Sequence, residues 1–193
     1  MSDASPKLFR EIRWPARYEP RVCPVHVRNE RVMAAAPDQV WAWLIRAPLW
    51  PTWYRNSANV RILAPGVIDL REGIRFRWRT FGIKITSTVL EFIPQERLAW
   101  DAKALGVDAY HAWTLQPGTD GCRVLTEETQ HGLVATVSHR LMPGRMHKYH
   151  QIWLEALERQ ARGPNGPDAA GGGTADHPAQ AHSHAATATA TGR

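Results

Sequence analysis

The chain has 193 residues, of which 44% are apolar and 22% charged, with 24 Lys and Arg against 18 Asp and Glu. The formal net charge is therefore +6, and the pI is about 9.8. This composition excludes a wholly disordered, a collagen-like and a disulfide-rich chain, and it predicts one globular domain that buries a core.

Membrane and export signals are missing from the sequence pattern. The longest strictly apolar stretch runs from Val40 to Ile45, far short of the roughly 20 residues that cross a bilayer. The N-terminal segment carries Asp3 and Glu11 and no apolar signal-peptide region. We therefore expect a cytoplasmic protein in which Cys23 and Cys122 are reduced.

Two changes in composition divide the chain into three parts. From Gly163 onward the sequence has no Leu, Ile, Val, Met or aromatic residue, so residues 163–193 are predicted to be a disordered tail. Residues 1–24 contain four prolines among scattered apolar residues and are predicted to be an extended segment. Residues 25–162 remain as the folded domain.

The first predicted elements are a strand and two short helices. The strand runs from Val25 to Met33. Pro37 suits the first position of a helix whose apolar residues recur at helical spacing through Ile45. Pro48 and Pro51 then end that helix and leave a short second one at Trp50 to Tyr54.

Six strands follow, each bounded by Gly or Pro turns. They are predicted at Val60 to Leu63, Ile74 to Phe81, Ile83 to Ile93, Leu98 to Ala104, Val107 to Leu115 and Cys122 to Gln130. Short connections favour an antiparallel sheet. In the second of these strands the alternation places Phe76 and Trp78 inward and Arg75, Arg77 and Arg79 outward.

A long amphipathic helix closes the domain, predicted from about Pro143, as its opening residue, to Ala161. The element order is then one strand, two helices, six strands and one long helix. A helix laid across the concave face of a curved sheet covers that face compactly. The fold class expected is α+β.

Three parts of the sequence carry a family resemblance: residues 34–54 (AAAPDQVWAWLIRAPLWPTWY), residues 88–100 (TVLEFIPQERLAW), and the closing pair 121–129 (GCRVLTEET) and 150–157 (HQIWLEAL). They resemble the START-like or SRPBCC superfamily, in particular its polyketide cyclase/dehydrase branch. The resemblance implies a helix-grip fold, a curved seven-stranded antiparallel sheet wrapped around a long C-terminal helix. It also implies a hydrophobic ligand, such as a lipid or a polyketide, between the sheet and that helix.

A ligand cavity of this kind needs apolar walls, and the inward positions of the strands and the last helix supply large aromatic residues. The ligand-binding residues expected are Trp53, Phe76, Trp78, Ser87, Trp100, Trp113, Thr126, Met146, His150 and Trp153. In the superfamily the segment corresponding to Trp50 to Tyr54 forms a lid at the cavity mouth. The alternative is that these aromatic residues simply fill the core.

Polar residues share the inward parity of two strands. His111 alternates with Ala109 and Trp113, and Glu128 alternates with Thr126. Such a pair can orient a ligand, or it can move protons, so His111 and Glu128 are the candidate catalytic residues. A single β-bulge would reverse this parity and turn Tyr110 and Asp101 inward instead.

Three functions stay open at this point. The leading one is binding of a hydrophobic, ring-containing small molecule, and the second is a polyketide cyclase, aromatase or dehydratase that uses His111 or Glu128 as proton carrier. The third is a non-catalytic interaction protein that uses its basic outer face. We expect no nucleic-acid partner, since RNA-binding signatures are missing.

Metal and cofactor sites are not expected. His147 and His150 have no Cys or carboxylate partner at zinc-site spacing. Nucleotide-binding glycine motifs and a nucleophile elbow are also missing.

Overall fold

The computed structural model describes residues 12–170. Its elements are η1 (Ala16–Tyr18), β1 (Val25–Met33), α1 (Pro37–Ile45), η2 (Ala47–Leu49), α2 (Trp50–Trp53), β2 (Ala58–Ile62), β3 (Arg75–Thr80), β4 (Ile83–Ile93), β5 (Arg97–Ala104), β6 (Val107–Gly118), β7 (Gly121–His131), α3 (Leu133–Leu141), α4 (Arg145–Ala161) and α5 (Pro167–Ala170). In this part of the chain no helix is long and apolar enough to cross a membrane.

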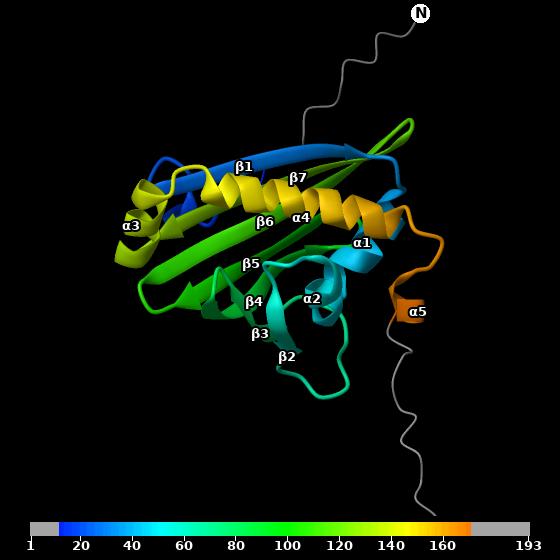
Figure 1. Cartoon of the computed structure of the whole chain (residues 1–193), viewed down its shortest axis with the longest axis horizontal. Helices are drawn as coiled ribbons and strands as arrows, with labels where there is room; N and C mark the ends of the chain where they lie inside the picture. The colour runs from blue at the N-terminus through cyan, green and yellow to red at the C-terminus, as the bar shows by residue number, and fades with distance from the viewer. Residues whose placement is uncertain (1–11, 171–193) are drawn as a thin grey trace, which may run out of the picture.

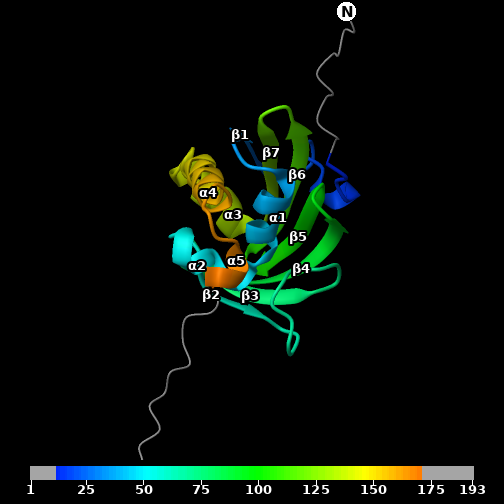
Figure 2. The ribbon, with the colours of Figure 1, turned by 90° about the vertical axis from the view of Figure 1, so that its right-hand side faces the viewer.

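The strands form one antiparallel sheet in the order β1-β7-β6-β5-β4-β3-β2. Figure 1 shows α4 lying across the concave face of this sheet, and Figure 2 shows the sheet curling beneath the helix. The predicted α+β helix-grip fold is confirmed, with α1 and α2 between the first two strands.

Two features of the helices differ from the sequence prediction. The last helix begins at Arg145, because Gly144 precedes it in the left-handed conformation (φ 77°), so the prediction of Pro143 as its opening residue is wrong. The nine-residue helix α3 was not predicted at all. Its apolar residues Leu133, Val137 and Leu141 recur four apart, which is the helical signal that could have identified it.

The inner face of the sheet holds the core. Phe76 and Trp78 are buried on β3, while Arg75, Arg77 and Arg79 are exposed, as predicted from the alternation. Aromatic rings meet across the sheet and helix interface: Trp113 on β6 lies 5.1 Å from Trp153 on α4 between ring centroids. These contacts fix α4 against the strands.

The outer face of the sheet is partly covered by the segment that precedes β1. Tyr18 stacks on Tyr110 with centroids 5.5 Å apart, and its carbonyl accepts a hydrogen bond from the Thr129 hydroxyl at 2.8 Å. Tyr110 is therefore buried on the outside of the sheet, beside Asp101 in the neighbouring strand. The alternative in which these two side chains face the cavity is wrong, since the bulge in β4 does not reach β6.

At the other end the structure continues past the predicted boundary at Gly163. Asp168 of α5 accepts a hydrogen bond from Arg46 at 2.8 Å, and Arg46 also contacts Asp69. The remainder of the predicted tail, like residues 1–11, lies outside the described residues. Cys23 and Cys122 are unpaired thiols, as expected.

The backbone of β7 at Gly121 lies very close to the end of β1, and a substitution of this glycine tests the contact. A Cβ at this position would collide with the backbone carbonyl oxygen of Met33, and the backbone has φ 148°. We expect Gly121→Ala to lower the unfolding free energy by about 3 kcal/mol in urea denaturation. Gly82→Ala is the control, since Gly82 has φ 79° with open space around it. This substitution should lower the unfolding free energy by only about 1 kcal/mol. Equal losses for the two variants would contradict the contact.

Candidate functional site

A cavity lies between the inner face of the sheet, α3 and the start of α4. Its volume is about 90 Å³, measured as the space that the centres of water molecules can occupy, and it opens to solvent. Trp78, Trp100 and Trp153 supply its apolar walls, and His111 and Glu128 lie on its floor. The cavity is thus apolar with one polar cluster, which is the usual character of a small-molecule site.

The structure brings some of the expected ligand-binding residues to this cavity and leaves others behind its wall. Trp78, Trp100, Met146, His150 and Trp153 line it, together with His111 and Glu128. Phe76, Trp113, Ser87 and Thr126 are buried just outside the lining. From that position Ser87 accepts a hydrogen bond from the indole of Trp78 at 3.1 Å, so it orients a wall residue.

The predicted lid segment contributes a residue other than the one expected. Trp53 is not part of the lining, whereas the neighbouring Tyr54 is. Tyr54 stacks on Trp153 with ring centroids 4.4 Å apart, so it belongs to the same wall as α4. The helix α3 supplies a wall that the sequence analysis missed, through Ala135 and Ser138, and Met142 directly after the helix extends it.

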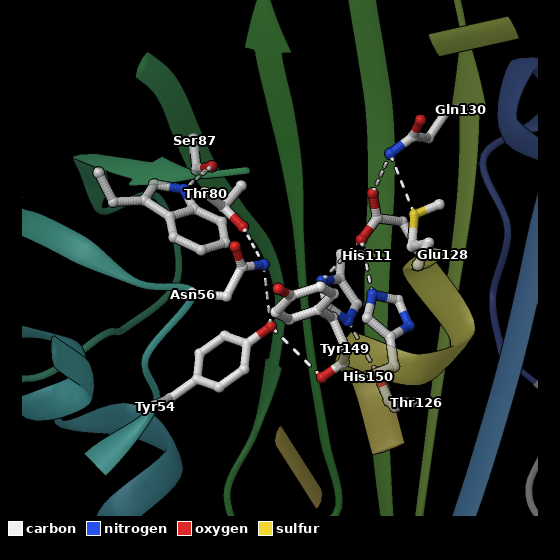
Figure 3. A network of polar contacts seen from close by, with 12 residues as sticks. Tyr54, Asn56, Thr80, Ser87, His111, Thr126, Glu128, Gln130, Tyr149 and His150 are labelled. Atoms are coloured by element: carbon white, nitrogen blue, oxygen red, sulfur yellow. Dashed lines mark hydrogen bonds and ion pairs between the residues drawn. The ribbon is translucent and has the colours of Figure 1, made fainter. Parts of the chain in front are cut away.

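The polar cluster on the cavity floor joins three elements. His111 on β6 lies directly opposite Glu128 on β7 in the strand register, and His150 reaches them from α4. The Nδ1 atom of His111 lies 3.1 Å from Oε2 of Glu128, and Nε2 of His150 lies 3.2 Å from the same oxygen. Figure 3 shows both rings turned toward this carboxylate. The spacing of His150 in the sequence gives no carboxylate partner, and tertiary packing supplies one.

The charges of this cluster follow from its burial. Burial lowers the pKa of His111 from 6.5 to about 3, so the ring is neutral at pH 7. Burial by itself raises the pKa of Glu128, but the two histidines and the Gln130 amide more than offset it, and the pKa falls to about 2. The floor of the cavity therefore carries one ionised carboxylate.

The hydrogen bonds assign the tautomers of the two rings. Because Glu128 is ionised and only accepts, Nδ1–H of His111 and Nε2–H of His150 both donate to it. Nε2 of His111 then accepts from the Thr126 hydroxyl at 2.7 Å. Gln130 donates to the second carboxylate oxygen at 2.5 Å. The Nδ1 atom of His150 is buried and has no hydrogen-bond partner in the described residues.

The same three side chains form a donor set that could hold a metal ion, since their ligand atoms lie within 4.8 Å of one another. Two imidazoles and a carboxylate suit a transition metal. However, the two rings are stacked, 4.8 Å apart between centroids and only 14° from parallel. An ion that lies in the planes of both rings would require one ring to turn. The observed arrangement therefore fits a hydrogen-bonded cluster better than a metal centre.

A second polar group borders the cavity on the side of Tyr54. The Asn56 amide donates to the Tyr54 hydroxyl at 3.2 Å and to the Thr80 hydroxyl at 3.0 Å. The Asn56 carbonyl accepts from the backbone N–H of Phe81 at 3.0 Å. Figure 3 shows this group facing the histidines across the site. The cavity thus has hydrogen-bonding groups on two sides.

Two further donors belong to the walls. The indole N–H groups of Trp100 and Trp153 are buried and have no hydrogen-bond partner within residues 12–170. Buried donors are rarely left unpaired.

The low pKa values make the cluster a source of acid sensitivity. Between about pH 6.5 and 3 the unfolded chain binds a proton at His111 that the folded protein does not, so lowering the pH favours unfolding. Glu128 acts in the same direction between about pH 4.5 and 2. We expect the unfolding free energy to fall as the pH drops below 6.5, and less steeply in His111→Asn. The control His147→Asn, with an exposed side chain on α4, should keep the original slope. An unchanged slope in His111→Asn would contradict the assignment.

Comparison with solved structures shows the same fold in several proteins. Hypothetical protein jhp0584 from Helicobacter pylori is 31% identical, with a TM-score of 0.74, over 79% of this chain and 96% of that one. The di-domain ARO/CYC protein StfQ from the steffimycin biosynthetic pathway is 15% identical, with a TM-score of 0.56, over 71% of this chain and 50% of that one. The di-domain ARO/CYC protein BexL from the BE-7585A pathway is 14% identical, with a TM-score of 0.59, over 73% and 51%. No curated protein matched the chain.

The family comparison covers most of the chain. Residues 24–162 match the model of the family described as polyketide cyclase / dehydrase and lipid transport. That range runs from just before β1 to the end of α4, so it includes every element that forms the cavity. The chain therefore belongs to this family, in the polyketide cyclase/dehydrase branch of the START-like superfamily.

Proposed function

We propose that the protein binds a hydrophobic, ring-containing small molecule, lipid or polyketide-like, that carries an oxygen atom on one side. The observation that supports this most is the apolar cavity with one ionised carboxylate in its lining. Burial of apolar ligand surface would contribute about 25 cal/mol per Å². The Glu128 cluster would select the orientation of the polar end of the ligand.

The size of the cavity sets a condition on binding. At about 90 Å³ it is smaller than an engineered cavity of about 150 Å³ that takes up benzene. A larger ring system therefore needs one wall to move. The wall most weakly held is α3, where Ala135 is the sole buried residue. Its movement, with Pro143 and Gly144 as the link to α4, would open the cavity.

Catalysis is the second candidate, in the form of a cyclase, aromatase or dehydratase, because a buried His–Glu pair is a common proton carrier. A general base works best when its pKa lies near the working pH. The pKa values of about 3 for His111 and about 2 for Glu128 lie far below neutrality. The electrostatics therefore favour a cluster that orients a ligand over one that moves protons.

Ligand binding can be measured through the tryptophans in the cavity wall. A panel of hydrophobic aromatic compounds with and without a carbonyl or hydroxyl group is added to the protein while tryptophan fluorescence and melting temperature are recorded. A true ligand quenches the tryptophan fluorescence to a saturating level. At a concentration of 100 times its Kd it also raises the unfolding free energy by about 2.7 kcal/mol. Ser138→Trp should fill the cavity from α3 and weaken binding at least tenfold, whereas Val137→Trp, on the other side of the same helix, should not. No response to any compound would contradict the proposal.

Substitution of the cluster separates binding from catalysis. With a compound that the protein binds, Glu128→Gln should weaken binding by about tenfold if the carboxylate orients the ligand. If the compound is also converted, Glu128→Gln or His111→Ala should abolish turnover while binding persists. Product analysis by mass spectrometry provides the readout, and the half-buried Glu155, which does not line the cavity, supplies the control Glu155→Gln.

A further inference from the structure

Exposed apolar side chains gather at the end of the molecule where α3 lies. Leu105, in the turn between β5 and β6, is 97% exposed, and Leu133 and Leu141 on α3 are 76% and 75% exposed. Val137, at 45%, lies between them on the helix. Isolated exposed apolar residues are ordinary, whereas a contiguous group marks a site of interaction.

These residues are close together because the β5–β6 turn packs against the start of α3. The backbone N–H of Val134 donates to the carbonyl of Gly106 at 3.1 Å. A Cβ at Gly106 would lie only 2.5 Å from a methyl carbon of Val134, so the two segments touch directly. Leu105 precedes Gly106 and Leu133 precedes Val134, which places the two leucines at the same edge. Figure 1 shows α3 at one end of the molecule, beside the first turn of α4.

The helix α3 therefore has apolar residues on two sides. Val134 and Ala135 line the cavity, while Leu133 and Leu141 are exposed to solvent. Exposure of apolar side chains to water on the outer side of a helix is unfavourable. An interface that covers these side chains removes them from water and gains free energy. The outer side of the cavity wall is thus the natural contact surface.

The charges along α3 and the first turns of α4 are all of one sign. From residue 132 to residue 154 the sequence contains no Asp or Glu. Arg140 and Lys148 are exposed, and Arg145 is half-buried with its guanidinium 4.8 Å from the Phe81 ring centroid. A second copy of the chain would bring these positive charges together, whereas an anionic membrane surface would attract them. Apolar side chains flanked by basic ones are typical of helices that lie in a lipid interface.

We infer that α3 and the β5–β6 turn form a docking surface for an anionic lipid bilayer. Leu105, Leu133 and Leu141 enter the acyl boundary, and Arg140 and Lys148 contact the phosphate groups. Docking covers the outer side of α3, which is one wall of the cavity, so a movement of this wall would let a hydrophobic molecule pass between the bilayer and the cavity. The docking surface itself does not depend on which ligand the cavity holds.

The test is cosedimentation of the full chain with vesicles of phosphatidylcholine alone and of phosphatidylcholine mixed with phosphatidylglycerol. We expect binding to the anionic vesicles that weakens as salt is raised. The triple variant Leu105→Ser, Leu133→Ser, Leu141→Ser should bind at least about tenfold more weakly. Its matched control is Val32→Ser, Ile68→Ser, Leu90→Ser, which replaces three exposed apolar residues elsewhere on the surface and should bind normally.

Charge variants identify the face that docks. Arg140→Gln with Lys148→Gln should weaken binding to anionic vesicles by about tenfold or more, whereas Arg75→Gln with Arg77→Gln, on the outer face of the sheet, should not. The proposal is overturned if the protein binds neither kind of vesicle or if the leucine variant binds normally. It is overturned as well if the variant with Arg75→Gln and Arg77→Gln loses binding while the variant with Arg140→Gln and Lys148→Gln keeps it. It is also overturned if light scattering shows a dimer that the leucine variant converts to a monomer. Ligand-induced quenching of tryptophan fluorescence in solution should survive in the leucine variant, so a failure of docking is distinguishable from a failure of ligand binding.

Discussion

The ionised carboxylate of Glu128 between His111 and His150 is the interaction on which the arrangement of the cavity depends. A charge in an apolar interior is tolerated only when hydrogen bonds replace the water it has lost. Here β6, β7 and α4 each supply part of that replacement, through His111, Gln130 and His150. The helix is therefore held over the sheet by a polar contact as well as by aromatic packing, and the rotation of α4 about its axis is constrained. The same contact leaves a polar floor in an otherwise apolar cavity.

The two ends of α4 are held very differently, and this difference decides where the cavity lies. Near α2, Trp50, Tyr54 and Trp153 pack ring against ring, with centroids 4.4 to 5.1 Å apart for the contacts of Trp153. Near α3 the large rings are replaced by Ala109, Ala102 and Ala135, and space remains. Aromatic packing thus makes a rigid base at one end, and small side chains make an opening at the other. The helix α3 is a single layer between that space and solvent, so the same helix forms the cavity wall on one side and the outer surface of the molecule on the other.

The candidate site could be predicted in part from the sequence because a β-strand has a period of two. Once Trp113 and Val124 were taken as inward, His111 and Glu128 had to share the inner face of the sheet. The strand pairing of β6 with β7 then sets them directly opposite one another. The helix gives no such rule for His150, because its partner comes from a strand about twenty residues away in the chain. Trp53 was expected in the cavity and Tyr54 was not singled out, because a four-residue helix has too little periodicity to define which side faces inward.

The sequence by itself determined the order of the strands, the antiparallel sheet and the long closing helix, since all of these follow from local periodicity and from turn residues. Only the tertiary structure decided that His150 joins Glu128, that Tyr110 is buried on the outside beneath Tyr18, and that α3 closes the cavity. These results depend on contacts between segments far apart in the chain. The local sequence pattern predicts which side of a helix or strand is apolar, whereas the tertiary packing determines which residues that side contacts.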